Sequence, residues 1–305
     1  MALIFVHTGP IPNYLLYAIE NARVFNPDCS IYLIGDRSHH RLDQLKVECV
    51  PIESVDSPRH QQFLQNYEHI SSLSEPFERF CFSRWFFVDQ LIETKGLHQA
   101  VHLDSDCMLF CQFDHIVSKL ERWKLAMSME GGPHCAFLNG GTKGLTDSIL
   151  RLFTDPSERK RRREFYEQGV QSGQNHGLND MVTLREYVYS HPSCCVDYSN
   201  LHNLGGIFEH SLDCSHGFQM KGRRKRILWQ QEDGMLIPYL QRIDTRERVR
   251  ALCLHFKGGC KRRMAPFNRA QAPSGALNLL PWLRKWEFNL PYWIWRGKTS
   301  LLAAD

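Results

Sequence analysis

The sequence predicts an α/β protein with a mostly parallel central sheet. Over the first hundred residues, short apolar runs alternate with longer segments of helical periodicity, which is typical of strand–helix–strand units. One apolar run ends in paired acidic residues, and ligands bind where the strands of open α/β sheets end. The 305 residues are 43% hydrophobic and 23% charged, a composition that excludes a disordered or low-complexity chain.

The elements expected before residue 104 follow from this periodicity. Four apolar runs bounded by turn residues predict strands, and two segments with apolar residues on one face predict amphipathic helices. Pro27 and Gly96 end the two helices. The strands are expected at 3–6, 31–34, 47–52 and 100–103, and the helices at 13–25 and 75–95.

The alternation weakens after residue 106. The turn signal at 232–234 (EDG) lies between apolar runs at 226–231 and 235–241, which predicts a hairpin. Further strands are expected at 124–129, 136–138 and 251–256, and helices at 146–153, within 159–175 and at 180–189. Because no repeat or linker interrupts the pattern, we expect one domain at 1–264 and a C-terminal tail at 265–305.

Charge and cysteine patterns narrow the class of protein. The net charge is only +4, but basic residues gather at 159–163, 223–226 and 261–263, which suits phosphate-rich or anionic partners and equally a solvated surface. Eleven scattered cysteines, with no CxxC pair and no signal peptide, indicate reduced thiols and no structural zinc.

No run of about 18 uncharged apolar residues occurs, so a transmembrane helix is not expected and we expect a cytoplasmic protein. The tail combines tryptophans with Lys and Arg, which suits either a peripheral membrane contact or packing on the domain.

Asp104 and Asp106 directly follow the strand expected at 100–103. In an extended chain their side chains project to the same side, because side chains alternate with a period of two. Paired carboxylates suit Mg²⁺ or Mn²⁺, which takes a few protein oxygens and leaves positions open for phosphate oxygens. The same pair also occurs in helix caps and surface turns.

A second group of residues ends the strand expected at 251–256 and reads HFKGGCK. A neutral imidazole of His255 can complete a metal shell, and the backbone N–H groups at Gly258 and Gly259 can approach phosphate closely. Lys261 can neutralise that phosphate. The alternative is a buried histidine beside a flexible turn and a surface lysine.

The DxD pair followed far down the chain by HxxGxxK resembles the GT-A-fold glycosyltransferases, especially the glycogenin-like and lipopolysaccharide galactosyltransferase-like retaining enzymes. The resemblance spans residues 2–261. It implies a GT-A (Rossmann-like) fold and metal-dependent transfer of a sugar from a nucleotide-diphosphate sugar, usually a UDP-sugar, with retention of configuration. The acceptor would be a saccharide, a lipid-linked molecule or a protein, and no nucleic-acid partner is expected.

The resemblance also implies roles for individual residues. Asp106 and His255 would bind Mn²⁺ or Mg²⁺, Asp104 would bind metal and ribose, and Lys261 would contact the diphosphate next to Gly258. Arg84 would face the phosphates or the ribose of the donor. Thr8 and Asp36 would line the nucleoside pocket.

Two middle segments are similar to family elements beside the transferred sugar. FLNGG at 137–141 resembles an FNSG-like turn and makes Asn139 a catalytic candidate. Asp180 resembles the aspartate of an NDQD-like segment and is expected to hydrogen-bond the sugar, although it also suits the N-cap of the next helix. Met181 stands where the family has glutamine, so no role of that amide is transferred.

Two other classes of protein remain open from the sequence. A haloacid-dehalogenase-like phosphatase would use Asp104 as nucleophile and Asp106 as general acid. The roughly 100 residues before the motif argue against it, because that region has its own strand and helix alternation. A basic RNA-binding or membrane-surface protein would use the two arginine-rich runs, although no nucleic-acid module motif is present.

Overall fold

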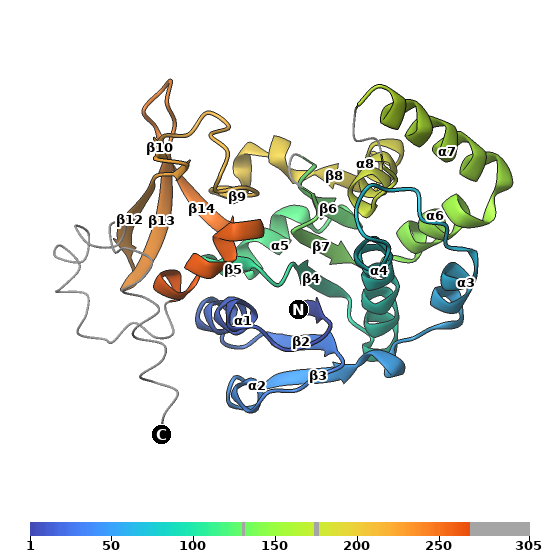
Figure 1. The fold of residues 1–305 in the computed structure, drawn as a ribbon. Coiled ribbons are helices and arrows are strands. Elements are labelled where there is room, and N and C mark those ends of the chain that lie inside the picture. The colour runs from blue at the N-terminus through green and yellow to red at the C-terminus, as the bar shows by residue number, and fades with distance from the viewer. Residues whose placement is uncertain (130–131, 174–176, 269–305) are drawn as a thin grey trace, which may run out of the picture.

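The computed structural model describes residues 1–129, 132–173 and 177–268. It has a seven-stranded sheet with helices on both faces and a smaller sheet beside it (Figure 1). Helices α1, α2 and α5 lie on one face of the larger sheet, and α3, α4 and α6 to α8 lie on the other (Figure 1). The α/β class with a mostly parallel central sheet, predicted from the sequence, is confirmed.

The N-terminal elements match the predicted periodicity closely. The element α4 has the predicted bounds, and Gly96 ends it in the left-handed conformation at φ 59°, which glycine adopts without a Cβ clash. Helices α2 and α3 were not predicted. The elements are β1 (Ala2–His7), α1 (Asn13–Phe25), β2 (Ser30–Gly35), α2 (His40–Gln44), β3 (Val47–Pro51), α3 (Pro58–Asn66), α4 (Glu75–Lys95) and β4 (Gln99–Leu103).

The middle of the chain adds short strands and a helical lobe. Helix α7 begins before the predicted position because Asp155 caps it, accepting from the backbone N–H groups of Ser157 and Glu158. The elements are β5 (Cys107–Leu109), α5 (Asp114–Leu120), β6 (Leu125–Met127), β7 (Cys135–Asn139), α6 (Lys143–Thr154), α7 (Pro156–Gln171), α8 (Asp180–Ser190) and β8 (Cys195–Asp197).

The C-terminal part forms most of the smaller sheet. The predicted hairpin is present, and its two-residue turn holds Asp233 and Gly234 at φ 48° and 79°, as a type I′ turn requires. The elements are β9 (Ile207–Glu209), β10 (Met220–Lys221), β11 (Arg224–Lys225), β12 (Ile227–Glu232), β13 (Met235–Gln241), β14 (Arg248–His255) and a 3₁₀ helix (Gly258–Arg263).

The larger sheet has the strand order β3-β2-β1-β4-β7-β6-β8, and all its strands except β7 run the same way. Phe5 of β1 pairs with Leu103 of β4, and His7 pairs with Gly35 of β2. The carboxyl ends of the parallel strands therefore meet at one edge, the edge at which Asp104 leaves β4.

The smaller sheet has the order β12-β13-β14-β5. Strand β9 also pairs with β14, on the side opposite to β5. Its strand β5 begins directly after Asp106 and pairs antiparallel with β14, which places Cys107 opposite His255. This pairing joins the two sheets at the DxD segment.

Among the described residues, no helix combines the length and the apolar character that crossing a bilayer requires. Residues 269–305, most of the predicted tail, lie outside the described part of the chain. Of the residues before them, Phe267 is buried and packs on Phe256 and Trp229, with ring centroids 5.1 and 5.5 Å apart. The division at residue 264 stays a prediction.

Candidate active site at the carboxyl edge of the sheet

The segment between β4 and β5 is a tight turn, because Cys107 N–H donates to the carbonyl of Asp104 at 3.0 Å. The chain is therefore not extended here, and the condition under which both carboxylates would project to the same side is not met. Asp106 is buried, Asp104 is partly exposed, and the two have different ionic partners.

Asp106 lies between the imidazole of His255 and the ammonium group of Lys261, both from the end of the described chain. Its carboxylate is 3.2 Å from Nε2 of His255 and 3.1 Å from Nζ of Lys261. Burial alone raises the pKa of Asp106, but the hydrogen bonds and charges of these two partners outweigh it and hold the pKa well below its usual range. Asp106 is an anion at neutral pH.

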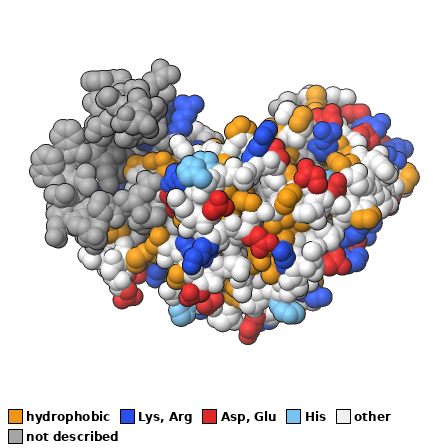
Figure 2. All heavy atoms as spheres, turned by 90° about the horizontal axis from the view of Figure 1, so that it is seen from below, with side chains coloured by type: hydrophobic (Ala, Val, Ile, Leu, Met, Phe, Trp, Pro, Cys, Tyr) orange, Lys and Arg blue, Asp and Glu red, His pale blue; other side chains and the backbone are white. Residues whose placement is uncertain are grey.

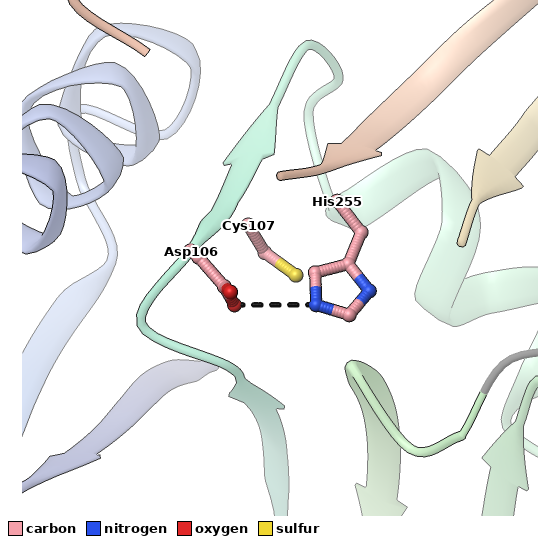
Figure 3. Close-up of side chains that lie close together, drawn as sticks. All are labelled: Asp106, Cys107 and His255. Atoms are coloured by element: carbon pink, nitrogen blue, oxygen red, sulfur yellow. Dashed lines mark ion pairs between the residues drawn. The ribbon is translucent and has the colours of Figure 1, made fainter. Parts of the chain in front are cut away.

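The orientation of His255 is fixed by its other ring nitrogen. Nδ1 donates to the carbonyl of His210 at 3.0 Å, so Nε2 faces Asp106 (Figure 3). A backbone carbonyl on one nitrogen is how proteins orient a metal-binding imidazole. Burial lowers the pKa of His255, yet the bond and charge of Asp106 more than compensate and raise it.

Asp106, Cys107 and His255 form the one group of at least three metal-ligating side chains in the described residues whose ligand atoms lie within 4.8 Å of one another. Burial raises the pKa of the Cys107 thiol well above its usual range, so it remains protonated, and its Sγ donates to the carbonyl of His134. Asp106 and His255 thus offer the oxygen and nitrogen ligands, and this pair fits a divalent cation such as Mg²⁺ or Mn²⁺.

Asp104 does not join that group but belongs to a second cluster. Arg84 of α4 donates to Asp104 at 2.6 Å and to Asp180 at 2.6 Å, and Trp85 Nε1 also lies 3.4 Å from Asp180. Burial would lower the pKa of Arg84, but the two carboxylates raise it. Both terminal nitrogens of Arg84 thus face carboxylates.

Asp180 is the first residue of α8, but it is not the cap of that helix. Asn179 caps it by accepting from Val182 N–H at 2.9 Å. The alternative role that the sequence allowed for Asp180 is therefore wrong, and its buried carboxylate is held at the site by Arg84.

Four buried polar atoms on residues near these clusters make no hydrogen bond within the described residues: Nε of Arg84, Nε2 of His102, Nε2 of His134 and Oε2 of Glu78. Burial lowers the pKa of His102 to about 4 and that of His134 to about 3, so both rings are neutral at physiological pH. Burial, with the charge of Asp180, raises the pKa of Glu78 to about 7. Buried polar atoms without a hydrogen bond are costly and rare, and a bound ion, a water molecule or a catalytic role can account for them.

Sequence reasoning missed His134. Its backbone carbonyl accepts from Asp104 N–H at 2.9 Å, and its ring stacks on His255 with centroids 5.0 Å apart. The sequence signal for His134 is its position two residues before the apolar run at 136–138. That position indicates the site only once the strand is known to run antiparallel to β4, because its start then lies beside the end of β4.

Asn139 is not brought to this site. Because β7 is antiparallel to β4, Asn139 pairs with Gln99, four residues before the end of β4, or roughly 13 Å from the edge at strand rise. Its amide donates to the carbonyls of Leu120 and Trp123 at 3.1 and 2.7 Å. The prediction that Asn139 lies beside the reacting sugar is wrong for this reason.

Thr8 and Asp36 lie at the predicted edge, one after β1 and the other after β2, and both are exposed. Asp36 accepts from Gly9 N–H at 2.7 Å and so joins the two loops. The strands approach so closely there that a Cβ on Gly35 would lie 2.6 Å from the carbonyl of His7.

Gly258 and Lys261 belong to the 3₁₀ helix that follows β14. Gly258 is exposed with φ 57°, a conformation that favours glycine. Nζ of Lys261 lies 5.0 Å from the ring centroid of Tyr14 on α1, so the ammonium group lies between Tyr14 and Asp106.

Most basic residues of the first run pair with acidic residues, so this run does not form a purely positive surface. In the run 159–163, Arg161 and Arg162 pair with Glu158, and Arg163 pairs with Glu68. In the second run, Lys225 is fully buried and pairs with Glu209. Figure 2 shows one face on which basic and acidic side chains are interspersed. The basic-surface alternative is not favoured, and neither is the phosphatase, since Asp104 is engaged by Arg84.

Comparisons with known proteins give structural matches only. No family model and no curated protein matches the chain. Mouse xyloside xylosyltransferase 1 is 10% identical, with a TM-score of 0.41 over 64% of this chain and 83% of that one.

Glycosyltransferase GlyE of Streptococcus pneumoniae is 13% identical, with a TM-score of 0.35 over 65% of this chain, which spans 45% of GlyE. Galactosyltransferase LgtC is 12% identical, with a TM-score of 0.33 over 61% of this chain and 70% of that one. These are proteins of the kind that the sequence motifs resemble.

Proposed function

We propose that the chain is a metal-dependent glycosyltransferase that moves a sugar from a nucleotide-diphosphate sugar to a hydroxyl group of an acceptor. One observation carries the proposal: β5 and β14 pair so that Asp106 meets His255 and Lys261, which lie about 150 residues further along the sequence. A carboxylate, an oriented imidazole and an ammonium group at the edge of an α/β sheet suit a bound cation and diphosphate.

Asp106 and His255 would hold Mg²⁺ or Mn²⁺, and Asp104, which accepts from Arg84 through Oδ1, would offer its other carboxylate oxygen at the turn. When bound, the cation acts as a Lewis acid that stabilises the negative charge of the departing diphosphate. Lys261 adds a fixed positive charge, and the backbone at Gly258 and Gly259 allows phosphate oxygens to approach, since both residues are exposed and a Cβ there would meet nothing within 4 Å.

In the reaction, the bond between the anomeric carbon and the phosphate oxygen breaks, and the nucleoside diphosphate leaves with the electron pair. The acceptor oxygen bonds to the anomeric carbon and loses its proton to the phosphate or to solvent. Asp180, a buried carboxylate fixed by Arg84 and Trp85, would orient the hydroxyls of the transferred sugar. Thr8 and Asp36 would line the nucleoside pocket.

The donor nucleotide and the stereochemistry are proposed from the resemblance to the GT-A family. A UDP-sugar would be the donor, and the anomeric configuration would be retained, with Met181 in the place of the family's glutamine. Proton NMR of the anomeric signal in the first product distinguishes retention from inversion.

Asp106→Ala tests the proposal. We expect a folded protein with sugar transfer reduced at least about 100-fold, because the cation and Lys261 lose their shared carboxylate. The readouts are release of nucleoside diphosphate from a panel of nucleotide sugars and thermal stabilisation by nucleoside diphosphates with and without Mn²⁺. Asp43→Ala, an exposed aspartate on α2, is the control. Near-normal transfer by Asp106→Ala would contradict the proposal.

A further inference from the structure

A cavity of about 550 Å³ opens beside the candidate active site. It lies where β6 and β8 end and is lined by Ser128 and Ser199 from these ends and by residues of the segment that follows β9, including His210 and His216. Strand β6 is antiparallel to β7, which is antiparallel to β4, so the cavity lies at the same edge of the sheet as Asp104. Its volume is in the range of ligand pockets.

The cavity and the Asp106 cluster share a wall. His210 lines the cavity, and its carbonyl accepts the hydrogen bond that orients His255. His255 in turn faces Asp106 at 3.2 Å. His210 therefore separates a molecule in the cavity from His255, which with Asp106 would hold the cation.

The charged groups of the cavity already have partners. Glu209 pairs with the buried Lys225, which also donates to the carbonyl of Ser211 at 2.9 Å. Arg242 lies over the ring of Phe218 at 5.2 Å and 3.8 Å from Glu247. Burial lowers the pKa of His210 to about 4, with nearby cations as a further cause. The buried charges of the cavity, Glu209 and Lys225, are thus paired with each other, and Arg242 already has a carboxylate nearby, which favours a ligand without a formal charge.

The rest of the lining combines aromatic faces with hydroxyls. The rings of His210 and His216 lie 4.5 Å apart, and Phe208 and Phe218 line the same space. The hydroxyls of Ser128 and Ser199 are 2.9 Å apart, and each oxygen keeps capacity for a further hydrogen bond. Aromatic faces with a few placed polar groups suit a ring with apolar C–H faces and a rim of hydroxyls.

His216 at the cavity has a costly backbone conformation. Its φ is 42°, in the left-handed region that non-glycine residues rarely adopt, and its side chain is exposed. Such conformations are unfavourable for non-glycine residues and cluster at active sites and ligand-binding sites. The strained position presents an aromatic ring next to that of His210.

We propose that this cavity binds the acceptor of the transfer and that the unit bound there is an uncharged saccharide. The assignment rests on the proposed function. The acceptor hydroxyl would approach the donor past the His210–His255 wall, and the aromatic rings of the cavity would hold the face of the saccharide ring.

His216→Asn tests the aromatic contact. Asparagine tolerates the left-handed conformation, so the variant removes the ring without adding backbone strain. His40→Asn is the matched control, because His40 also stacks on a neighbouring histidine, at 4.4 Å, but lies on α2 away from the cavity. Ser199→Phe, at an exposed position of the lining, is a second variant that fills the cavity.

Saturation-transfer NMR measures binding of the methyl glycosides of glucose, galactose, mannose and xylose, and of methyl glucuronide, to each full-length protein with UDP and Mn²⁺. We expect at least one uncharged glycoside to bind, roughly tenfold more weakly to His216→Asn and not detectably to Ser199→Phe, with the control unchanged. UDP–Mn²⁺ binding, followed by calorimetry, should be the same in all four proteins.

Absence of glycoside binding, equal binding by all four proteins, or preference for methyl glucuronide would overturn the cavity assignment, whatever the nucleotide result. Glycoside binding that is lost in the two cavity variants while no protein binds UDP–Mn²⁺ would support the cavity as a saccharide site and contradict the proposed donor.

Discussion

The two halves of the candidate site have opposite arrangements of charge. In one, a single carboxylate, Asp106, lies between the ammonium group of Lys261 and the imidazole of His255. In the other, a single cation, Arg84, lies between the carboxylates Asp104 and Asp180. The first half is built by strand pairing across distant sequence, and the second is held by one helix.

The burial of the two cations differs as well. The side chain of Arg84 is 12% exposed, whereas that of Lys261 is 34% exposed. A buried cation between two carboxylates is needed for folding, because its loss leaves uncompensated charges. A partly exposed cation can exchange its carboxylate for a phosphate. We therefore expect Arg84 to support stability and Lys261 to support binding.

Arg84→Met tests the expected contribution of Arg84 to stability and should have the largest effect. Removing the guanidinium leaves Asp104 and Asp180 without a cation, so we expect the free energy of unfolding to fall by about 3–5 kcal/mol. Urea denaturation measures it. Arg79→Met, on the same helix with an exposed partner at Glu75, should stay within about 0.5 kcal/mol. Equal losses in both variants would show that Arg84 is an ordinary surface cation.

Glu78→Gln tests the charge balance beside Asp180. Burial raises the pKa of Glu78 from 4.5 to about 7, so the folded state keeps its proton longer than the unfolded state. Stability should then fall as pH rises from about 4.5 to 7 and level off above, by on the order of 3 kcal/mol, a loss that the glutamine variant avoids.

Chemical denaturation between pH 4.5 and 8 measures this difference. The control is Glu93→Gln, an exposed position on the same helix, which should follow the parent curve. If Glu78→Gln also followed the parent curve, the carboxyl group would not be held in its protonated form.

Lys261→Met should weaken binding of a nucleoside diphosphate about 10- to 100-fold, the loss expected for one charge-assisted contact, with a stability change below about 1 kcal/mol. Calorimetric titration with UDP and Mn²⁺ gives the affinity. Its exposed neighbour Arg262 provides the control variant Arg262→Met. A stability loss in Lys261→Met as large as that in Arg84→Met would remove the difference between the two halves.

Asn179→Ala should have the smallest effect. It removes the cap that accepts from Val182 N–H and so loosens the start of the helix that carries Asp180, at a cost of about 1 kcal/mol. Thermal denaturation detects the change, and Asn179→Asp, which keeps the capping oxygen, should restore stability.

The parallel part of the fold could be predicted because its signals are local. The bounds of α4 and the positions of β1 to β4 follow from periodicity, and the carboxyl edge follows from their shared direction. The placement of Asn139 could not be predicted, because a strand of five residues gives no sign of its direction. The turn at Asp104 was missed for a similar reason, since backbone curvature at one residue leaves no periodic pattern.

The site could be predicted only where the spacing of the motifs indicated it. The structure brings Asp106 and His255 together, two of the three predicted ligands, whereas Asp104, the third, pairs with Arg84. The pairs Arg84–Asp104 and Arg84–Asp180 depend on how α4 packs against the sheet. His134 and the cavity beside His210 depend on strand direction and on loop packing, which one sequence does not specify.

The pairing of β5 with β14 also sets a time at which the site can form. During synthesis, β1 to β4 leave the ribosome together and can pair early, while Asp106 is still without its counter-charges. His255 emerges 149 positions after Asp106, so closing that contact is a long-range and therefore slow step. A nascent chain can thus hold the parallel sheet while the contact between Asp106 and His255 has yet to form.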